Sequence, residues 1–343
     1  MKRPTQSDVA KRAGVSRATV SYVLNDPQHN LAISRETRIR VLQAMDDLGY
    51  QPDTRAQSLR SGDSKTIGLL IPDIHNPHFW QTVEGVEEEA RKSGYDLLLA
   101  HSNANQDLED YCLTSLSRRT ISGLIIIKAT HAFSAKSKKR LLQSGRPIVE
   151  CSDNPSPFDS IVTHYRDATQ EAMRYLLALG HRRFAFINGV AHLVVGTDRL
   201  EPFHATLSEA GIAMSERSVI NCGITPEDSY QAAYQLLKHL QRPTAVVVIN
   251  DLLAIGVLRA AADLGLAIPK DLSVLGFDDI PIARYLNPRL TTVHRDTKAE
   301  GQQATRMLLE RLANPNLPVR TLTMPAKLIL RESIGPVPGQ QSG

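Results

Sequence analysis

The segment from Asp8 to Asn25 combines polar side chains with a spacing that is typical of two short helices. In the second of these helices Val20, Val23 and Leu24 fall at i, i+3 and i+4, so they form one apolar face. The residues left on the opposite face are Arg17, Ala18, Ser21 and Tyr22. A guanidinium and hydroxyl groups on an exposed helix can hydrogen-bond to base edges in the major groove of DNA. The pattern therefore predicts a helix-turn-helix that reads DNA, although a purely structural pair of helices would show the same stripe.

The elements that position this face are marked by their end signals. Thr5 followed by Asp8 is a capping box that begins a first helix. Gly14 ends that helix, because glycine adopts the left-handed conformation at low cost, and Val15 can pin the turn to the core. Ser16 then caps the second helix. The apolar side of the first helix consists of Val9, Ala10 and Ala13.

A third helix and a short segment follow. Ser34 can cap this helix and Gly49 can end it. Its apolar residues are Ile39, Leu42, Met45 and Leu48. Beyond Pro52, Asp53 can cap residues 54–60, which are too few to form a stable helix unless another surface holds them. Leu59 is the one large apolar side chain of that segment.

Length and composition predict soluble globular domains. The chain has 343 residues and 42% hydrophobic content, with no apolar run of 18 residues or more. Its first residues, MKRPTQSDVAKRAG, lack the apolar core of a signal peptide, so we expect a cytoplasmic protein without a membrane span. Cys112, Cys151 and Cys222 show no metal-binding spacing, so we interpret them as buried apolar residues.

Positive charge is concentrated in the first 64 residues. They hold ten Lys and Arg against seven Asp and Glu, whereas the remaining 279 residues hold thirty against twenty-nine. This excess fits contact with phosphate groups, but ordinary solvated helix faces would explain it as well.

From Lys65 onward short apolar runs alternate with amphipathic segments. The predicted strands are 67–71, 97–100, 124–127, 148–151, 184–187, 245–249 and 272–277. The predicted helices between them include 79–92, 167–179, 226–240 and 252–264. Because this alternation is typical of parallel sheets covered by helices, and the strands are too many for one small sheet, we expect two similar α/β subdomains that divide near Thr163.

The motifs of common enzymes are absent from this region. It contains no G-x-G-x-x-G, G-x-x-x-x-G-K-[ST], G-x-S-x-G or H-E-x-x-H. The histidines His101, His131, His192 and His239 have no ligand or triad spacing. We therefore expect no catalytic residues, metal or cofactor. A sugar-binding protein of a transport system is the better rival hypothesis, but it would carry a signal peptide in place of a DNA-binding head.

From Thr5 to about Ser333 the chain resembles the LacI/GalR family of bacterial transcription regulators. The resemblance rests on DVAKRAGVSRATVSYVLN, SRETRIRVLQAMDDLGYQPDTRAQSLRSG, TIGLLIPDIHNPHF, GYDLLLAHSN, GLIII, GHRRFAFI, INDLLAIGVLRAAADLGLAIPKDLSVLGFDD and LTTVHRD. It implies a small all-α helix-turn-helix head plus an α/β periplasmic-binding-protein-like body of two doubly wound parallel-sheet subdomains, with an effector cleft between the lobes.

The resemblance also implies the domain boundaries. The head would cover residues 1–49 and a hinge segment 50–64, and the effector-binding, dimerising body 65–334. The chain would cross back near Val293 and Leu322, which places lobe 1 at about 65–162 and 293–322 and lobe 2 at about 163–292 and 323–334. Residues 335–343, with the sequence GPVPGQQSG, would be a flexible tail. Since the end of the chain lacks leucine heptads, we expect a dimer and not a tetramer.

The resemblance assigns DNA contacts to the head and the hinge. The expected DNA-binding residues are Thr5, Ser16, Arg17, Ala18, Thr19, Ser21, Tyr22, Asn25, Arg55, Ala56, Gln57 and Leu59. Residues 54–60 would fold as a hinge helix in the minor groove, where Leu59 would act as a wedge between base steps. The alternative is that Leu59 packs under its own domain. Tyr22 stands where the family usually has Arg, so we expect the preferred operator to differ at the outer bases of each half-site.

The resemblance further places effector contacts around the cleft. The expected residues are Asp73, Asn76, His78, Phe79, Arg199, Asn250 and Asp278, with Asp251, Asp279 and Asp296 as weaker candidates. Ordinary roles compete with each assignment: turn formation for the first four, a structural salt bridge for Arg199, and helix capping for Asn250 and Asp278. Trp80 is expected to be a core residue.

Some positions depart from the family pattern. Several side chains near the cleft differ from the polar or aromatic ones of many relatives; they are Thr163, His164, residues 193–195 and Ile224. These differences favour a less polar ligand. We nevertheless expect a sugar or sugar derivative as effector. The predicted function is a repressor of a catabolic or uptake operon that binds a palindromic operator as a dimer and is released by its effector; the alternatives are a corepressor or activation of some promoters.

Overall fold

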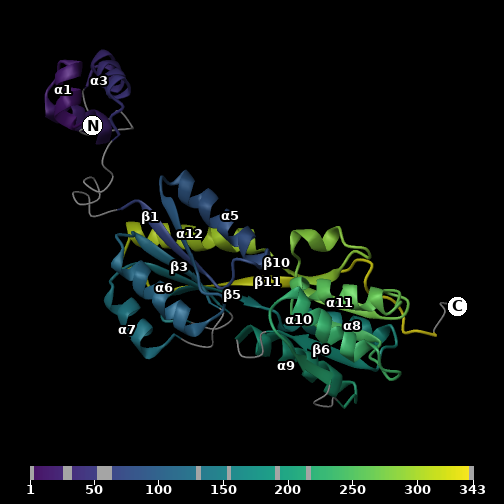
Figure 1. Ribbon diagram of the computed structural model, residues 1–343. Coiled ribbons are helices and arrows are strands. Elements are labelled where there is room, and N and C mark those ends of the chain that lie inside the picture. The colour runs from purple at the N-terminus through teal and green to yellow at the C-terminus, as the bar shows by residue number, and fades with distance from the viewer. Residues whose placement is uncertain are drawn as a thin grey trace. The chain divides into compact units, whose positions relative to one another are not determined.

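The computed structural model describes residues 4–25, 33–51, 64–128, 133–152, 156–189, 194–213 and 218–339. The chain divides into two compact units, a head of residues 1–64 and a body of residues 65–343 (Figure 1).

The described residues of the head form the helices α1 (Gln6–Ala13), α2 (Arg17–Asn25) and α3 (Arg35–Leu48). The predicted end signals are confirmed. The Thr5 backbone N–H donates to Asp8 Oδ2 over 2.8 Å and closes the capping box, and Gly14 has φ of 64°. Ser16 Oγ accepts the backbone N–H of Thr19 at 3.0 Å. Local sequence therefore determines where these helices begin and end.

The core of the head corrects one sequence prediction. Val9, Val20 and Val41 are fully buried at its centre. Of the expected apolar stripe of α3, Ile39 is 55% exposed and Leu42 is 51% exposed. The helix turns Val41 and Ala44 inward instead, with Met45 and Leu48 partly buried beside them. The 3–4 spacing fits both rows of residues, so periodicity alone did not distinguish them.

The body is built from two lobes of parallel strands covered by helices. The helices are α5 (His78–Lys92), α6 (Gln106–Arg118), α7 (Ala135–Gln143), α8 (Arg166–Ala178), α9 (Val194–Glu209), α10 (Pro226–Leu237), α11 (Asp251–Asp263) and α12 (Thr297–Ala313), with the 3-10 helix η2 (Pro281–Arg284). The strands are β1 (Thr66–Ile71), β2 (Asp96–His101), β3 (Gly123–Ile127), β4 (Ile148–Ser152), β5 (Asp159–His164), β6 (Phe184–Asn188), β7 (Val219–Asn221), β8 (Ala245–Val248), β9 (Ser273–Asp278), β10 (Thr291–Arg295) and β11 (Thr321–Ile329).

The strands follow the order β2-β1-β3-β4-β5-β11-β10-β9-β8-β6-β7. The last strand joins the two lobes. Its first half pairs in parallel with β5, with Leu322 opposite Ile161, and its second half pairs antiparallel with β10, with Leu328 opposite Val293. The chain thus crosses between the lobes after β5, after β10 and within β11. All seven predicted strands are present, whereas β5, β7, β10 and β11 were not among them.

Each lobe has its own core. In lobe 1, α5 and α12 cover one face of the sheet, and α6 and α7 cover the other (Figure 1). Helices α5 and α12 cross very closely, because a Cβ atom at Gly85 would lie only 2.1 Å from the carbonyl oxygen of Lys298. Lobe 2 surrounds the fully buried side chains of Phe186, Phe203 and Phe277. Burial of this kind supplies most of the favourable free energy of folding.

The segment after Ser333 is held against lobe 2, which corrects the predicted flexible tail for residues 335–337. The buried His181 places Nε2 at 2.9 Å from the carbonyl oxygen of Gly335. The backbone N–H of Val337 donates to the carbonyl of Leu179 at 2.9 Å. A Pro- and Gly-rich composition did not reveal these backbone partners, because they come from distant parts of the sequence.

Candidate functional site

The outer face of α2 presents the residues expected to read DNA. Arg17 and Ala18 are exposed, and Tyr22 is 54% exposed. Ser21 is half-buried. Because Val20 and Val23 are buried in the core of the head, the rotation of α2 about its axis is fixed and the opposite face stays exposed.

Three other predicted DNA-binding residues take part in helix capping. Thr5 belongs to the capping box of α1. Ser16 caps α2, and its Oγ lies 2.9 Å from Oγ1 of Thr19. The side chain of Asn25 and the hinge residues Arg55, Ala56, Gln57 and Leu59 lie outside the described residues.

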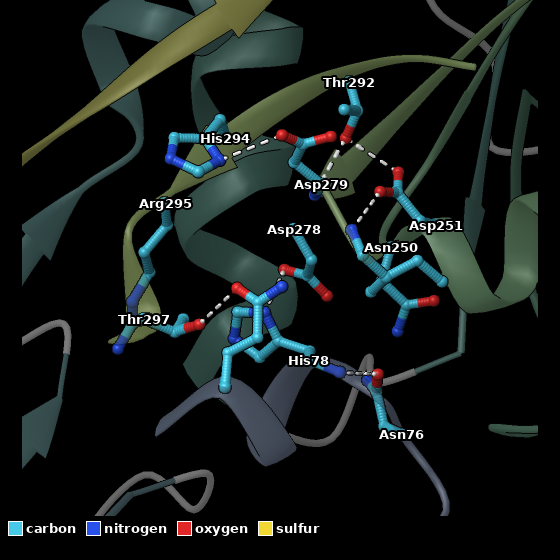
Figure 2. A network of polar contacts seen from close by, with 12 residues as sticks. Asn76, His78, Asn250, Asp251, Asp278, Asp279, Thr292, His294, Arg295 and Thr297 are labelled. Atoms are coloured by element: carbon cyan, nitrogen blue, oxygen red, sulfur yellow. Dashed lines mark hydrogen bonds and ion pairs between the residues drawn. The ribbon is translucent and has the colours of Figure 1, made fainter. Parts of the chain in front are cut away.

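In the body, the loop after β1 uses its predicted site residues to form a turn. Asp73 Oδ1 accepts the backbone N–H of His75 at 2.8 Å, and Asn76 Oδ1 accepts that of His78 at 3.0 Å. Phe79 is half-buried and meets the His78 ring edge-on, with 5.0 Å between ring centroids. The turn begins α5 and holds the His78 imidazole at the junction with lobe 2, as Figure 2 shows.

Lobe 2 contributes a buried ion pair to this junction. Arg199 of α9 donates from Nη2 to Oδ1 of Asp278 at 3.0 Å, and both residues are at most 5% exposed. The guanidinium also donates to the carbonyl of Ile249. It lies 4.3 Å from the ring centroid of Tyr165 and 5.0 Å from that of Phe277. Hydrogen bonds and aromatic faces together hold Arg199 in one orientation.

His78 faces this pair from lobe 1. Its Nδ1 lies 3.7 Å from Asp278 Oδ1, and it has no hydrogen-bond partner among the described residues (Figure 2). Burial lowers the pKa of His78 to about 4; the negative charge of Asp278 opposes this shift, whereas the positive charges of Arg295 and Arg199 act in the same direction as burial. His78 is therefore a neutral imidazole at pH 7.

Asp251 and Asp279, two of the weaker candidates, stabilise the turn that carries Asp278. Asp251 is fully buried; its Oδ1 accepts the Thr292 hydroxyl at 2.7 Å and its Oδ2 accepts the backbone N–H of Ile280 at 3.0 Å (Figure 2). Burial raises the pKa of Asp251 well above its ordinary value, and the charge of Asp278 adds to that effect.

The partners of the neighbouring Asp279 favour its ionised form. Burial opposes ionisation, but hydrogen bonds from His294 and Arg331 prevail and lower the pKa of Asp279. The Nδ1 of His294 lies 3.1 Å from Asp279 Oδ2. Asp278 and Asp279 have φ of 101° and 52°, a conformation that side chains rarely adopt, and the contacts of Asp251 and Asp279 hold the turn in it.

Asn250 and Asp296 cap helices. Asn250 Oδ1 accepts the backbone N–H of Leu253 at 2.9 Å at the start of α11. Asp296 Oδ1 accepts that of Ala299 at 3.0 Å at the start of α12. Both side-chain oxygens therefore cap helices, which is the alternative role that the sequence offers for Asn250. Trp80, expected in the core, is 44% exposed, and its Nε1 donates to the carbonyl of Ile74 at 3.1 Å.

Sequence reasoning missed Tyr165 as a site residue. It is fully buried and follows the last residue of β5, so it lies where the chain crosses from lobe 1 to lobe 2. An aromatic residue at the start of a helix is usually a core residue, and no sequence signal linked it to Arg199. Nearby, Thr163 is fully buried, and its Oγ1 has no hydrogen-bond partner among the described residues.

The described residues contain no group of His, Cys, Asp and Glu that could hold a metal ion. In the part of the chain that the structure describes, no helix is long and apolar enough to cross a membrane. The three cysteines are free, and burial raises the pKa of Cys222 to about 11.

A helix-turn-helix followed by a two-lobed α/β body with a buried polar site at the lobe junction defines a ligand-responsive DNA-binding regulator. Two family descriptions match the chain: "Bacterial regulatory proteins, lacI family" at residues 5–53, and "Periplasmic binding protein-like domain" at residues 173–334. The HTH-type transcriptional repressor PurR of Proteus mirabilis is 35% identical over 97% of this chain and 98% of its own length. The chain belongs to the LacI family of bacterial regulatory proteins, and it is a DNA-binding transcriptional repressor and not an enzyme.

Solved structures agree with this assignment. The Lac repressor dimer bound to operator and the anti-inducer ONPF is 28% identical, with a TM-score of 0.84 over 97% of this chain and 99% of that chain. A LacI family transcriptional regulator from Enterococcus faecium with bound ribose is 30% identical, with a TM-score of 0.70 over 79% of this chain and 99% of that chain. Both the fold class and the repressor function expected from the sequence are confirmed.

Proposed function

We propose that this repressor binds a palindromic operator in the cytoplasm as a homodimer and is released by a small polar effector, a sugar or sugar derivative, between its lobes. The observation that carries the proposal is the buried Arg199–Asp278 pair of lobe 2, which faces the neutral His78 of lobe 1. A guanidinium and a carboxylate that are fixed side by side can together bind the hydroxyl groups of one small molecule. The LacI family regulator with bound ribose supports this ligand class.

The same site lies at the junction of the lobes, where ligand binding can change the arrangement of lobe 1 relative to lobe 2. His78 belongs to lobe 1, whereas Arg199 and Asp278 belong to lobe 2. The Tyr165 ring stacks on Arg199 directly after the chain has crossed between the lobes. An effector that binds one lobe arrangement better than the other would shift the population towards it and so change the affinity for DNA.

The recognition face of α2 would enter the major groove of each half-site, with Arg17 and Tyr22 contributing to sequence preference. A dimer joins two modest contacts into one tight complex. In the hinge, Leu59 would act as the minor-groove wedge, so Leu59→Ala should weaken operator binding strongly and leave effector binding unchanged. Equal operator affinity of Leu59→Ala and the wild type in a gel-shift titration would reject the wedge.

A thermal-shift screen of sugars, sugar acids, polyols and nucleosides tests the effector proposal. A ligand at about 100 times its Kd stabilises the folded state by about 2.7 kcal/mol. Asp278→Asn should abolish the shift produced by any hit, whereas Asp263→Asn, on the surface of lobe 2, should keep it. Retained DNA binding by Asp278→Asn would show that the variant is folded. A full ligand response in that variant would refute the assigned site.

A further inference from the structure

Asp279, the residue after Asp278, contacts the two strands that connect the lobes near the candidate site. Its Oδ1 accepts Nη2 of Arg331, which lies just beyond the end of β11, and its Oδ2 lies 3.1 Å from Nδ1 of His294 in β10 (Figure 2). Its backbone N–H donates to Oγ1 of Thr292, also in β10, at 3.3 Å. Asp279 is therefore fixed by groups of β10 and of the segment that follows β11.

The carboxylate of Asp279 is directed at the protein. Each of its oxygens faces a basic side chain, and the residue is only 8% exposed. Burial raises the pKa of Asp279, but the contacts with His294 and Arg331 together lower it below its ordinary value, so the carboxylate is ionised. A buried charge is strongly destabilised when its partners move away, so this cluster responds to small displacements.

The strand that carries His294 also contacts lobe 1. The next residue, Arg295, donates from Nε to Oε2 of Glu300 at 3.1 Å. Glu300 belongs to α12, which packs on the lobe 1 sheet, and it is fully buried. Two adjacent residues at the end of β10 thus bind one carboxylate of lobe 2 and one carboxylate of lobe 1. A rotation of one lobe relative to the other acts directly on these two buried contacts.

Asp278 and Asp279 lie in one constrained turn. Their φ angles of 101° and 52° are rarely adopted by residues other than glycine, so few alternative backbone conformations are open to them. The turn is fastened by Asp251, whose Oδ2 accepts the backbone N–H of Ile280 at 3.0 Å. In the pairing of β9 with β10, His294 lies opposite Asp278. A ligand that displaces Asp278 therefore also displaces the Asp279 carboxylate relative to His294.

A second ion pair nearby shows what an ordinary contact between these segments looks like. Arg289, just before β10, pairs with Glu332, just beyond β11, over 2.8 Å, but their side chains are 59% and 48% exposed. Water screens such a pair, so its loss has little effect on either strand. It provides a matched control for the buried contacts of Asp279.

We propose that Asp279 is a positioning residue that couples the effector site to the arrangement of the lobes. It does not contact the effector; it transmits a displacement of Asp278 to His294 and β10. This inference rests on the proposed effector site at Asp278. Because coupling between two binding sites is reciprocal, binding of operator DNA by the head must in turn change the stability of the turn that contains Asp279.

Hydrogen–deuterium exchange of the full-length protein measures this reciprocal effect. The probe is an operator duplex that the wild type selects from a pool of random DNA, added to saturation. Peptides covering residues 276–282 report on the turn, because the amides of Asp279 and Ile280 are hydrogen-bonded within it. In the wild type the operator should change the exchange rate of these peptides by about fivefold or more.

Two variants remove the coupling contact from either side. D279N and H294L should each reduce the operator-induced change in residues 276–282 to less than about twofold. Each variant is compared with itself, with and without DNA, so a general loosening of the turn cancels. If one variant fails to fold, the other still tests the contact.

The matched control is E332Q, which removes a neighbouring carboxylate from the exposed pair with Arg289 and should keep the wild-type change. The proposal is overturned if the operator leaves residues 276–282 of the wild type unchanged, if D279N and H294L respond as the wild type does, or if E332Q loses the response as well. Failure of the effector site itself is detected separately, by a retained thermal shift in Asp278→Asn, and that assay contains no DNA.

Discussion

Replacing His78 tests whether the junction between the lobes holds a neutral imidazole. Burial lowers the pKa of His78 to about 4 from an ordinary value of 6.5. Between these values the unfolded chain binds a proton that the folded chain does not, so stability is present above pH 6.5 and falls as the pH falls. From pH 7 to pH 5 this one group should cost the wild type about 2 kcal/mol, and the loss should reach about 3 kcal/mol below pH 4.

The assay is urea unfolding of the wild type and of His78→Gln at pH 7 and pH 5. Fluorescence of Trp80, the only tryptophan, reports on the body because this residue lies two positions further along α5. Glutamine has no proton to gain, so the variant should lose about 2 kcal/mol less than the wild type on acidification. Burial also lowers the pKa values of the buried His181 and the half-buried His204, but both residues remain in both proteins, so their effects cancel in the comparison.

His239→Gln is the control for the loss of a surface imidazole, because His239 is exposed. If the wild type and His78→Gln lose the same free energy of unfolding between pH 7 and pH 5, the neutral state of His78 and its burial between Asp278, Arg199, Arg295 and His294 are refuted.

Three further predictions concern stability. Gly85→Ala should destabilise the body by about 1–3 kcal/mol, since the new Cβ would lie 2.1 Å from the Lys298 carbonyl oxygen; helix propensity alone would stabilise it, so the sign of the change in urea unfolding decides. Asp278→Asn should cost about 2–3 kcal/mol because Arg199 stays buried, whereas Asp263→Asn, in an exposed pair with Arg259, should cost less than about 1 kcal/mol; equal losses would contradict the buried pair. Thr5→Ala should cost the head about 1 kcal/mol in thermal unfolding followed by circular dichroism, without moving the Trp80 transition of the body. An unchanged melting temperature of the head would show that this cap contributes nothing.

Local signals in the sequence predicted the helix ends and the central strands. Thr5, Gly14, Ser34 and Gly49 act on backbone groups within a few residues, so their effect does not depend on the rest of the fold. Six of the seven predicted strands are mostly apolar and buried along their whole length, and β2 is apolar but half-buried; such runs are visible without knowing their neighbours. The strands that were missed are partly exposed or carry polar residues, as in β11, where half-buried and exposed positions are mixed and Pro325 interrupts the apolar pattern.

The candidate site shows where local signals end. The sequence by itself determined the family, the two kinds of unit, and the identities of Arg199 and Asp278 as residues of interest. Only the tertiary structure decided that these two, 79 positions apart, form one buried pair, that His78 faces them from the other lobe, and that Tyr165 stacks on Arg199. It also decided that Asn76 and Asn250 use their side-chain oxygens for a turn and a cap. The physical reason is that the role of a side chain depends on the groups around it. Folding brings those groups together from distant positions, and the local sequence at each position does not show which distant groups it will contact.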